Sequence, residues 1–159
     1  PRLLKNSNMA IKSGGKQILI HGLALVLLGL LWGFAVPHTP LPLLALGAHI
    51  QSPLNEMLFM LMALLLLALL HNVGARPALV MVMVTAACLT WLMVRSEVAN
   101  AWRETTEVLA IAAKQAGATG GALWQELIVK LTHIGAGIGL IVAWMLLIAG
   151  FVRKPAVQS

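Results

Sequence analysis

Hydrophobic and polar residues are arranged along this chain in long blocks. Four apolar blocks occupy residues 18–36, 54–70, 78–94 and 134–152, and a more polar segment separates each block from the next. The first block holds 19 residues without a charge; as a helix it would be about 28 Å long and would nearly match a hydrocarbon core of roughly 30 Å. The pattern predicts an all-α integral membrane protein with four transmembrane helices in an antiparallel bundle.

The first block has an alternative interpretation as a cleaved signal peptide. It follows a basic lead, and Gly33-Phe34-Ala35 imitates a small-x-small cleavage site. The apolar run is longer than the 7 to 15 residues usual in a signal peptide. We therefore expect a retained helix.

The start of the second span has two interpretations. Ser52 followed by Pro53 fits an N-cap and a first helical position, which places the span at residues 54–70. Alternatively, the helix begins near Pro42, directly after the proline-rich segment. The short connection at residues 71–77 predicts that spans two and three are antiparallel neighbours.

Residues 95–133 form the one long hydrophilic connection, divided by a glycine-rich segment at 117–121. Apolar residues recur at helical spacing in both halves, so each half is predicted to be helical. The halves would lie on the outer membrane surface or continue spans three and four outward as a hairpin. The hairpin is favoured because no Pro or Gly interrupts residues 78–116.

Composition agrees with a membrane location. The chain is 60% hydrophobic and 10% charged, whereas soluble domains have about 45–50% apolar and about 25% charged residues. Its 159 residues are enough for a single membrane domain, residues 1–159. The single cysteine, Cys88, excludes a disulfide framework within one chain and a cysteine-based metal site. Gly29 and Gly33, like Gly135 and Gly139, have a spacing that permits close helix packing, inside the bundle or between subunits.

Basic residues predict the orientation. With the N-terminus inside, seven Lys or Arg residues are cytoplasmic and four are outside, which favours cytoplasmic termini in an inner membrane. The inner set is Arg2, Lys5, Lys12, Lys16, Arg76, Arg153 and Lys154, and the outer set is Arg95, Arg103, Lys114 and Lys130. Contact with anionic lipid accounts for the formal charge of +6 without a nucleic-acid partner.

The polar stretch at residues 48–57 is the candidate site, because polar groups in a membrane helix usually face a protein interior or a cavity. It contains His49, Asn55 and Glu56, and Glu56 is the one carboxylate within the four predicted spans. If one helix includes all three residues, Glu56 lies almost directly below His49 and Asn55 points about 120° away from it. One helix would then serve two surfaces.

Five histidines are available for metal or cofactor chemistry. On this topology His38, His49 and His133 lie toward the outer face, and His21 and His71 toward the inner face. Zinc needs three or four converging ligands, and the set His49, His133 and Glu56 has no supporting sequence spacing. Haem needs only one or two imidazoles and an apolar slot, so it fits this chain better. A Ser-His-Asp triad is excluded because the chain has no Asp.

Two short motifs carry a resemblance to a known family. Ile20-His21-Gly22-Leu23 is followed by an apolar run to Trp32-Gly33, and Ala48-His49 is followed by Pro53, Leu54 and Asn55. The chain thereby resembles the membrane-bound styrene oxide isomerases, whose first two spans carry a similar HG and a similar A-H-x4-L-N with a nearby Pro. The resemblance is carried by residues 17–70.

The resemblance implies a homotrimeric four-helix protein with haem b between subunits. By this resemblance His49 holds a ferric iron, and Asn55 orients the oxygen of a small hydrophobic epoxide. The iron would act as a Lewis acid, and a hydride shift would give the aldehyde. The family's isomerases also use an Asp and a Tyr, which this chain lacks; Glu56, where the family has a Gly, is the candidate electrostatic replacement.

Two other functions remain open at this stage. A haem electron-transfer module would use two axial imidazoles, supplied by His21 with His71 or by His49 with His133. A haem-binding or sensing protein would keep the cofactor and lack the reaction. The missing Asp and Tyr make haem binding a firmer expectation than epoxide isomerisation.

Overall fold

The computed structural model describes residues 2–68 and 77–152. Within them it contains the helices α1 (Arg2–Ala35), η1 (Val36–His38), α2 (Pro42–Ala68), α3 (Pro77–Asn100), α4 (Ala110–Ala116) and α5 (Leu123–Val152), and no strand. In this part of the chain four helices, α1, α2, α3 and α5, are long and apolar enough to cross a membrane. The predicted all-α, four-span membrane fold is confirmed.

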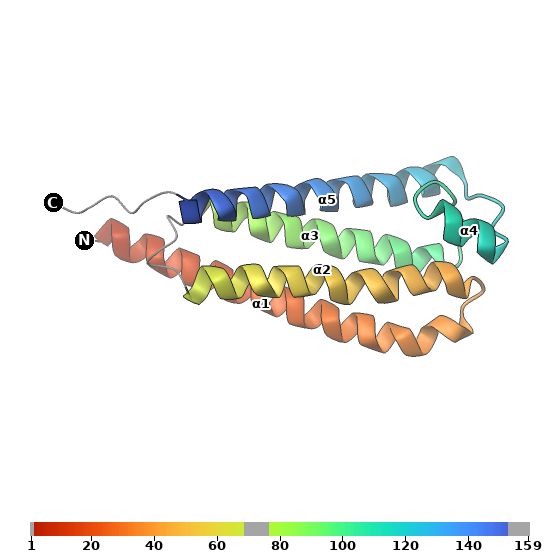
Figure 1. The fold of residues 1–159 in the computed structure, drawn as a ribbon, viewed down its shortest axis with the longest axis horizontal. Coiled ribbons are helices and arrows are strands. Elements are labelled where there is room, and N and C mark those ends of the chain that lie inside the picture. Colours follow the sequence, from red (N-terminus) through yellow and green to blue (C-terminus); the bar gives the residue numbers. More distant parts are fainter. Residues whose placement is uncertain (1, 69–76, 153–159) are drawn as a thin grey trace.

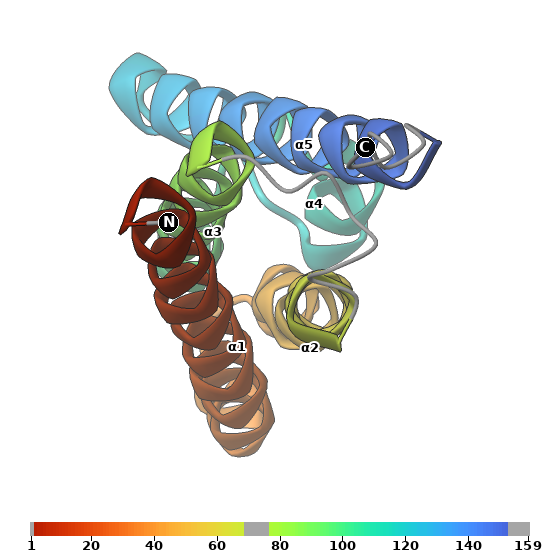
Figure 2. The same cartoon turned by 90° about the vertical axis from the view of Figure 1, so that its left-hand side faces the viewer.

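The long helices run antiparallel, with the start of α1 and the end of α5 at one end of the bundle (Figure 1). The short helix α4 lies at the opposite end. The closest pairs are α1 with α2 and α3 with α5, and α3 also contacts α1 and α2. Seen along the bundle, α2 and α5 lie apart, on either side of the region where α4 is seen (Figure 2).

Glycines let α1 approach α2 closely. A Cβ atom at Gly29 would lie 2.9 Å from Pro53 Cδ, and one at Gly33 would lie 2.6 Å from His49 Cε1. In α5, a Cβ at Gly139 would lie 3.3 Å from the Cα atom of Ala86 in α3. In the described chain, these glycines therefore serve packing inside the bundle, one of the two roles predicted from their spacing.

The second span begins earlier than residue 54. Helix α2 starts at Pro42 and contains Pro53 in its interior, so the assignment of Ser52 and Pro53 to a helix start is wrong. Proline removes one backbone N–H and leaves the carbonyl of His49 without its intrahelical donor. The Ser52 hydroxyl donates to the Leu25 carbonyl of α1 at 3.0 Å. This hydrogen bond links the turn of α2 before Pro53 to α1. The predicted end at residue 70 lies outside the described residues.

The connection at residues 95–133 differs from the favoured hairpin. Its second half does belong to α5, which begins at Leu123. In the first half, however, α3 continues only to Asn100, and the one further helix is the short α4. The Asn100 side chain accepts the Thr105 N–H at 2.9 Å. The Glu126 carboxylate accepts backbone N–H groups of Thr106, Glu107 and Gly121 at 2.7 to 3.2 Å. These bonds fold the segment over the bundle end.

Candidate functional site

The three residues predicted for the site lie on α2 but do not share one surface. His49 packs against α1, and Asn55 lines a cavity between α2, α3 and α5. Glu56 is fully buried, and neither of its carboxyl oxygens has a hydrogen-bond partner among the described residues. Because Glu56 is not among the residues that line the cavity, the structure does not place it in contact with a substrate there.

The imidazole of His49 is held in one orientation by α1. Its Nδ1 lies 2.8 Å from the Gly29 carbonyl oxygen. A carbonyl can only accept, so Nδ1 carries the proton and Nε2 keeps its lone pair. Gly33 leaves room for the ring, because a Cβ there would come within 3.2 Å of Nε2. Nε2 itself makes no hydrogen bond with a described residue, and metal-binding histidines commonly have this arrangement.

None of the other described histidines combines an Nδ1–H held by a backbone carbonyl with an Nε2 free of hydrogen bonds. The Trp91 indole N–H donates to His21 Nδ1 at 3.1 Å, so the proton of a neutral His21 is on Nε2, the nitrogen that faces away from Trp91. Both nitrogens of His133 are hydrogen-bonded. His71 lies outside the described residues. Within the described chain, no group of three or more His, Cys, Asp or Glu residues could hold a metal ion.

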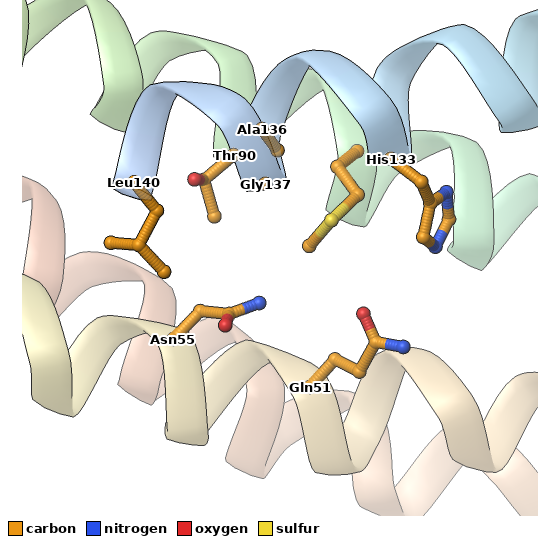
Figure 3. A pocket seen from close by; sticks show the side chains of 8 residues that line it. Gln51, Asn55, Thr90, His133, Ala136, Gly137 and Leu140 are labelled. Atoms are coloured by element: carbon orange, nitrogen blue, oxygen red, sulfur yellow. The ribbon is translucent and has the colours of Figure 1, made fainter. Parts of the chain in front are cut away.

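The cavity that Asn55 lines has a volume of about 220 Å³ (Figure 3). Asn55 and Gln51, one helical turn apart on α2, project toward α5 in this view. The full lining is Gln51, Asn55, Thr90, Met93, His133, Ala136, Gly137 and Leu140. The Thr90 hydroxyl donates to Ala86 O at 3.0 Å, which leaves its oxygen as an acceptor. The lining therefore combines four apolar residues with four polar side chains.

Sequence reasoning missed the contribution of Gln51 and Thr90 to this cavity. Gln51 and Asn55 are four residues apart, and two amides at that spacing on an apolar helix were a readable sign of one polar face. Thr90 carried no such sign, because its neighbours in α3 are apolar and its place depends on packing against the other helices.

A buried acid–base pair adjoins the cavity. His133 Nε2 lies 2.7 Å from Glu97 Oε1, and His133 Nδ1 lies 2.7 Å from the Val129 carbonyl oxygen. The Glu97 side chain is 0% exposed and that of His133 is 15% exposed. Since Nδ1 must donate to the carbonyl, one proton is shared between Nε2 and Oε1. Glu97 Oε2 is buried and has no partner among the described residues.

Comparison with known proteins extends the sequence resemblance through most of the chain. A family model described as styrene oxide isomerase matches residues 15–152, which includes α3 and α5. Hydroxylaminobenzene mutase HabB of Ectopseudomonas oleovorans is 31% identical over 141 residues, which cover 89% of this chain and 83% of that protein. No solved structure matches significantly.

Proposed function

The chain belongs to the styrene oxide isomerase family, and from this premise we propose that it is a membrane isomerase that binds haem b through His49. The observation that carries the proposal is the state of the His49 ring. The Gly29 carbonyl accepts a hydrogen bond from His49 Nδ1 at 2.8 Å, so Nε2 keeps its lone pair and would be available to hold an iron.

When bound, the haem would supply a ferric iron that polarises a bond to oxygen as a Lewis acid. The protein's own residues have two tasks beside it. His49 would hold the iron, and the amide of Asn55 would donate to the substrate oxygen from the cavity side of α2. Glu56, proposed from sequence as a second catalytic group, is given no contact with the substrate because it does not line the cavity.

We further propose that the protein is a homotrimer with haem at each subunit interface. His49 lies on the α1 side of α2, whereas Asn55 faces the cavity on the α5 side. One copy would therefore contribute the iron ligand and a neighbouring copy would contribute the substrate cavity. Membrane lipid is the other expected partner; no nucleic acid is expected.

We propose the inner membrane as the location, with both termini cytoplasmic and α4 outside. Gln115 in α4 is exposed, so Gln115→Cys should react with a membrane-impermeant maleimide in intact cells. Lys12→Cys, at the opposite end of the bundle, should react only after permeabilisation. The reverse result would invert the topology. Both variants are made in a Cys88→Ala background so that the native thiol does not contribute.

Two substrate classes fit the proposal. The family suggests an aryl epoxide that rearranges to an aldehyde. The 31% identity to a hydroxylaminobenzene mutase favours a second candidate, an aryl hydroxylamine whose hydroxyl moves from nitrogen to the ring and gives an aminophenol. Both reactions are intramolecular and both break a bond to oxygen.

Asn55→Leu should lower kcat/KM about 10²- to 10³-fold without changing haem content. The reason is that leucine has nearly the same size but cannot donate to a developing negative oxygen, and one such donor accounts for about this factor. The measurement is turnover of styrene oxide and hydroxylaminobenzene by ferric protein, with the haem-to-protein ratio. Met57→Leu, on an exposed part of α2, is the control. Wild-type protein that converts neither substrate would disprove the proposed function.

A further inference from the structure

Gly137 is a glycine of α5 whose missing side chain is not explained by helix packing. Glycine is unfavourable inside a helix, and close approach of another helix is its usual reason in a membrane protein. A Cβ atom at Gly139 would lie 3.3 Å from Ala86 Cα of α3, whereas a Cβ at Gly137 would have no atom of another described element within 4 Å. Close packing therefore explains Gly139 but not Gly137.

The geometry of α5 places position 137 at the cavity. His133, Ala136, Gly137 and Leu140 all line it, and this spacing of three, four and seven residues defines one face of a helix. Gly137 lies in the middle of that face, across the cavity from Asn55 of α2 (Figure 3). A side chain at position 137 would therefore enter open cavity space without displacing described atoms of the protein.

The volume of the cavity makes this space important. An engineered apolar cavity of roughly 150 Å³ binds benzene, so a cavity of about 220 Å³ has room for one aromatic ring with a small substituent. Hydrophobic sites discriminate about 10- to 200-fold between ligands that differ by one methylene group. A methyl group added to the cavity wall at position 137 would compete for space with a methyl group on the ring of the ligand.

We propose, on the basis of the isomerase function proposed above, that Gly137 is a specificity-determining residue. The open space in front of it accepts a substituent on the aromatic ring of the substrate, and the absence of a side chain sets the size of that substituent. Gly137 is given no part in the chemical step. The proposal is therefore the same for an epoxide and for a hydroxylamine.

The first test measures substrate selectivity with haem-loaded protein in nanodiscs. The substrates are the candidate that wild-type protein converts and its three derivatives with a methyl group ortho, meta or para on the ring. Gly137→Ala should lower kcat/KM for at least one methyl derivative about 10- to 200-fold relative to the unsubstituted compound. Turnover of the unsubstituted compound and the haem content should change little, and Gly137→Val should extend the loss to further derivatives.

Gly135→Ala is the matched control, because it makes the same substitution one half-turn earlier in α5. Its Cβ would lie 3.8 Å from Leu89 Cδ2, and Gly135 does not line the cavity. This variant should change kcat/KM for all four compounds by the same factor. Selectivity lost equally in Gly135→Ala and Gly137→Ala would overturn the inference, because it would follow from the helix and not from the cavity.

A second measurement does not depend on haem. Phenol and the three cresols are titrated into haem-free protein, and their dissociation constants are measured by nuclear magnetic resonance. Gly137→Ala should weaken binding of at least one cresol about 10- to 200-fold relative to phenol, and Gly135→Ala should leave these ratios unchanged. Wild-type protein that binds phenol and rejects all three cresols would contradict the proposal, because no space would then be available for a ring substituent.

The two proposals can fail separately. If wild-type protein converts neither candidate substrate, the proposed function fails, and the cresol titration still decides whether Gly137 sets the size of the cavity. If wild-type protein is an active isomerase and Gly137→Ala keeps the wild-type selectivity, the isomerase function stands and the role of Gly137 is wrong. Loss of haem or a changed oligomeric state in Gly137→Ala would also overturn the inference, because the residue would then serve assembly.

Discussion

His49→Ala protein is expected to lose its haem and, with it, all isomerase turnover. Alanine removes the one described imidazole whose Nδ1–H is fixed by a backbone carbonyl and whose Nε2 is left free. The measurement is the Soret band of the purified protein, set against protein concentration, together with product formation from both candidate substrates. The His49→Ala variant should show no protein-bound Soret band after haem is added to the purified protein.

The matched control is His21→Ala. This substitution removes an imidazole of the same size from α1, but that ring accepts the Trp91 N–H and is not proposed to bind iron. It should retain haem content and spectrum. Wild-type haem content in His49→Ala, or loss of haem in His21→Ala alone, would refute the assignment of His49 and would favour a different ligand.

Gly33→Ala should weaken haem binding about 10- to 100-fold, the range typical for disturbing a group that orients a metal ligand. The added Cβ would lie 2.6 Å from His49 Cε1 and 2.9 Å from Nδ1, so the ring has to move. Its hydrogen bond to Gly29 would be lost or bent, and Nε2 would point elsewhere. Titration of haem into haem-free protein measures the dissociation constant directly.

Gly135→Ala controls for adding a methyl group to a transmembrane helix. Its Cβ would lie 3.8 Å from the nearest side-chain atom, Leu89 Cδ2, which is ordinary contact. We expect an unchanged dissociation constant for haem and an unchanged helical circular dichroism signal. Equal haem affinity in wild-type protein and Gly33→Ala would mean that the contacts of His49 with Gly29 and Gly33 do not position its imidazole for iron binding.

The sequence by itself determined the class of the protein and the number of its spans. Exposing long uncharged apolar runs to water is unfavourable, so they favour the bilayer. There they must form helices, because the backbone N–H and C=O groups can be satisfied only by hydrogen bonds within the segment. The sequence also determined the angles between candidate residues on α2. Since a helix advances by a fixed step, Asn55 had to face away from His49 once both lay in one helix.

The boundaries were decided by tertiary contacts. Ser52 and Pro53 look like a helix start, yet α2 continues through them, with Ser52 bonded to Leu25 of α1. In the same way, the side chains of Asn100 and Glu126 bind backbone N–H groups and prevent α3 from continuing through a segment that contains no Pro or Gly. Local propensity cannot report the bonds from Ser52 to Leu25 and from Thr106 to Glu126, because the partners are 27 and 20 residues apart in the sequence.

The cavity and its acid–base pair also became visible only in three dimensions. Glu97 and His133 are 36 residues apart, and nothing in their separate neighbourhoods indicates that α3 and α5 bring them within 2.7 Å. The same packing leaves α2 and α5 apart and opens the cavity at Asn55. Hydropathy depends on composition within a helix, whereas proton sharing depends on the distance between two helices, and only the folded bundle sets that distance.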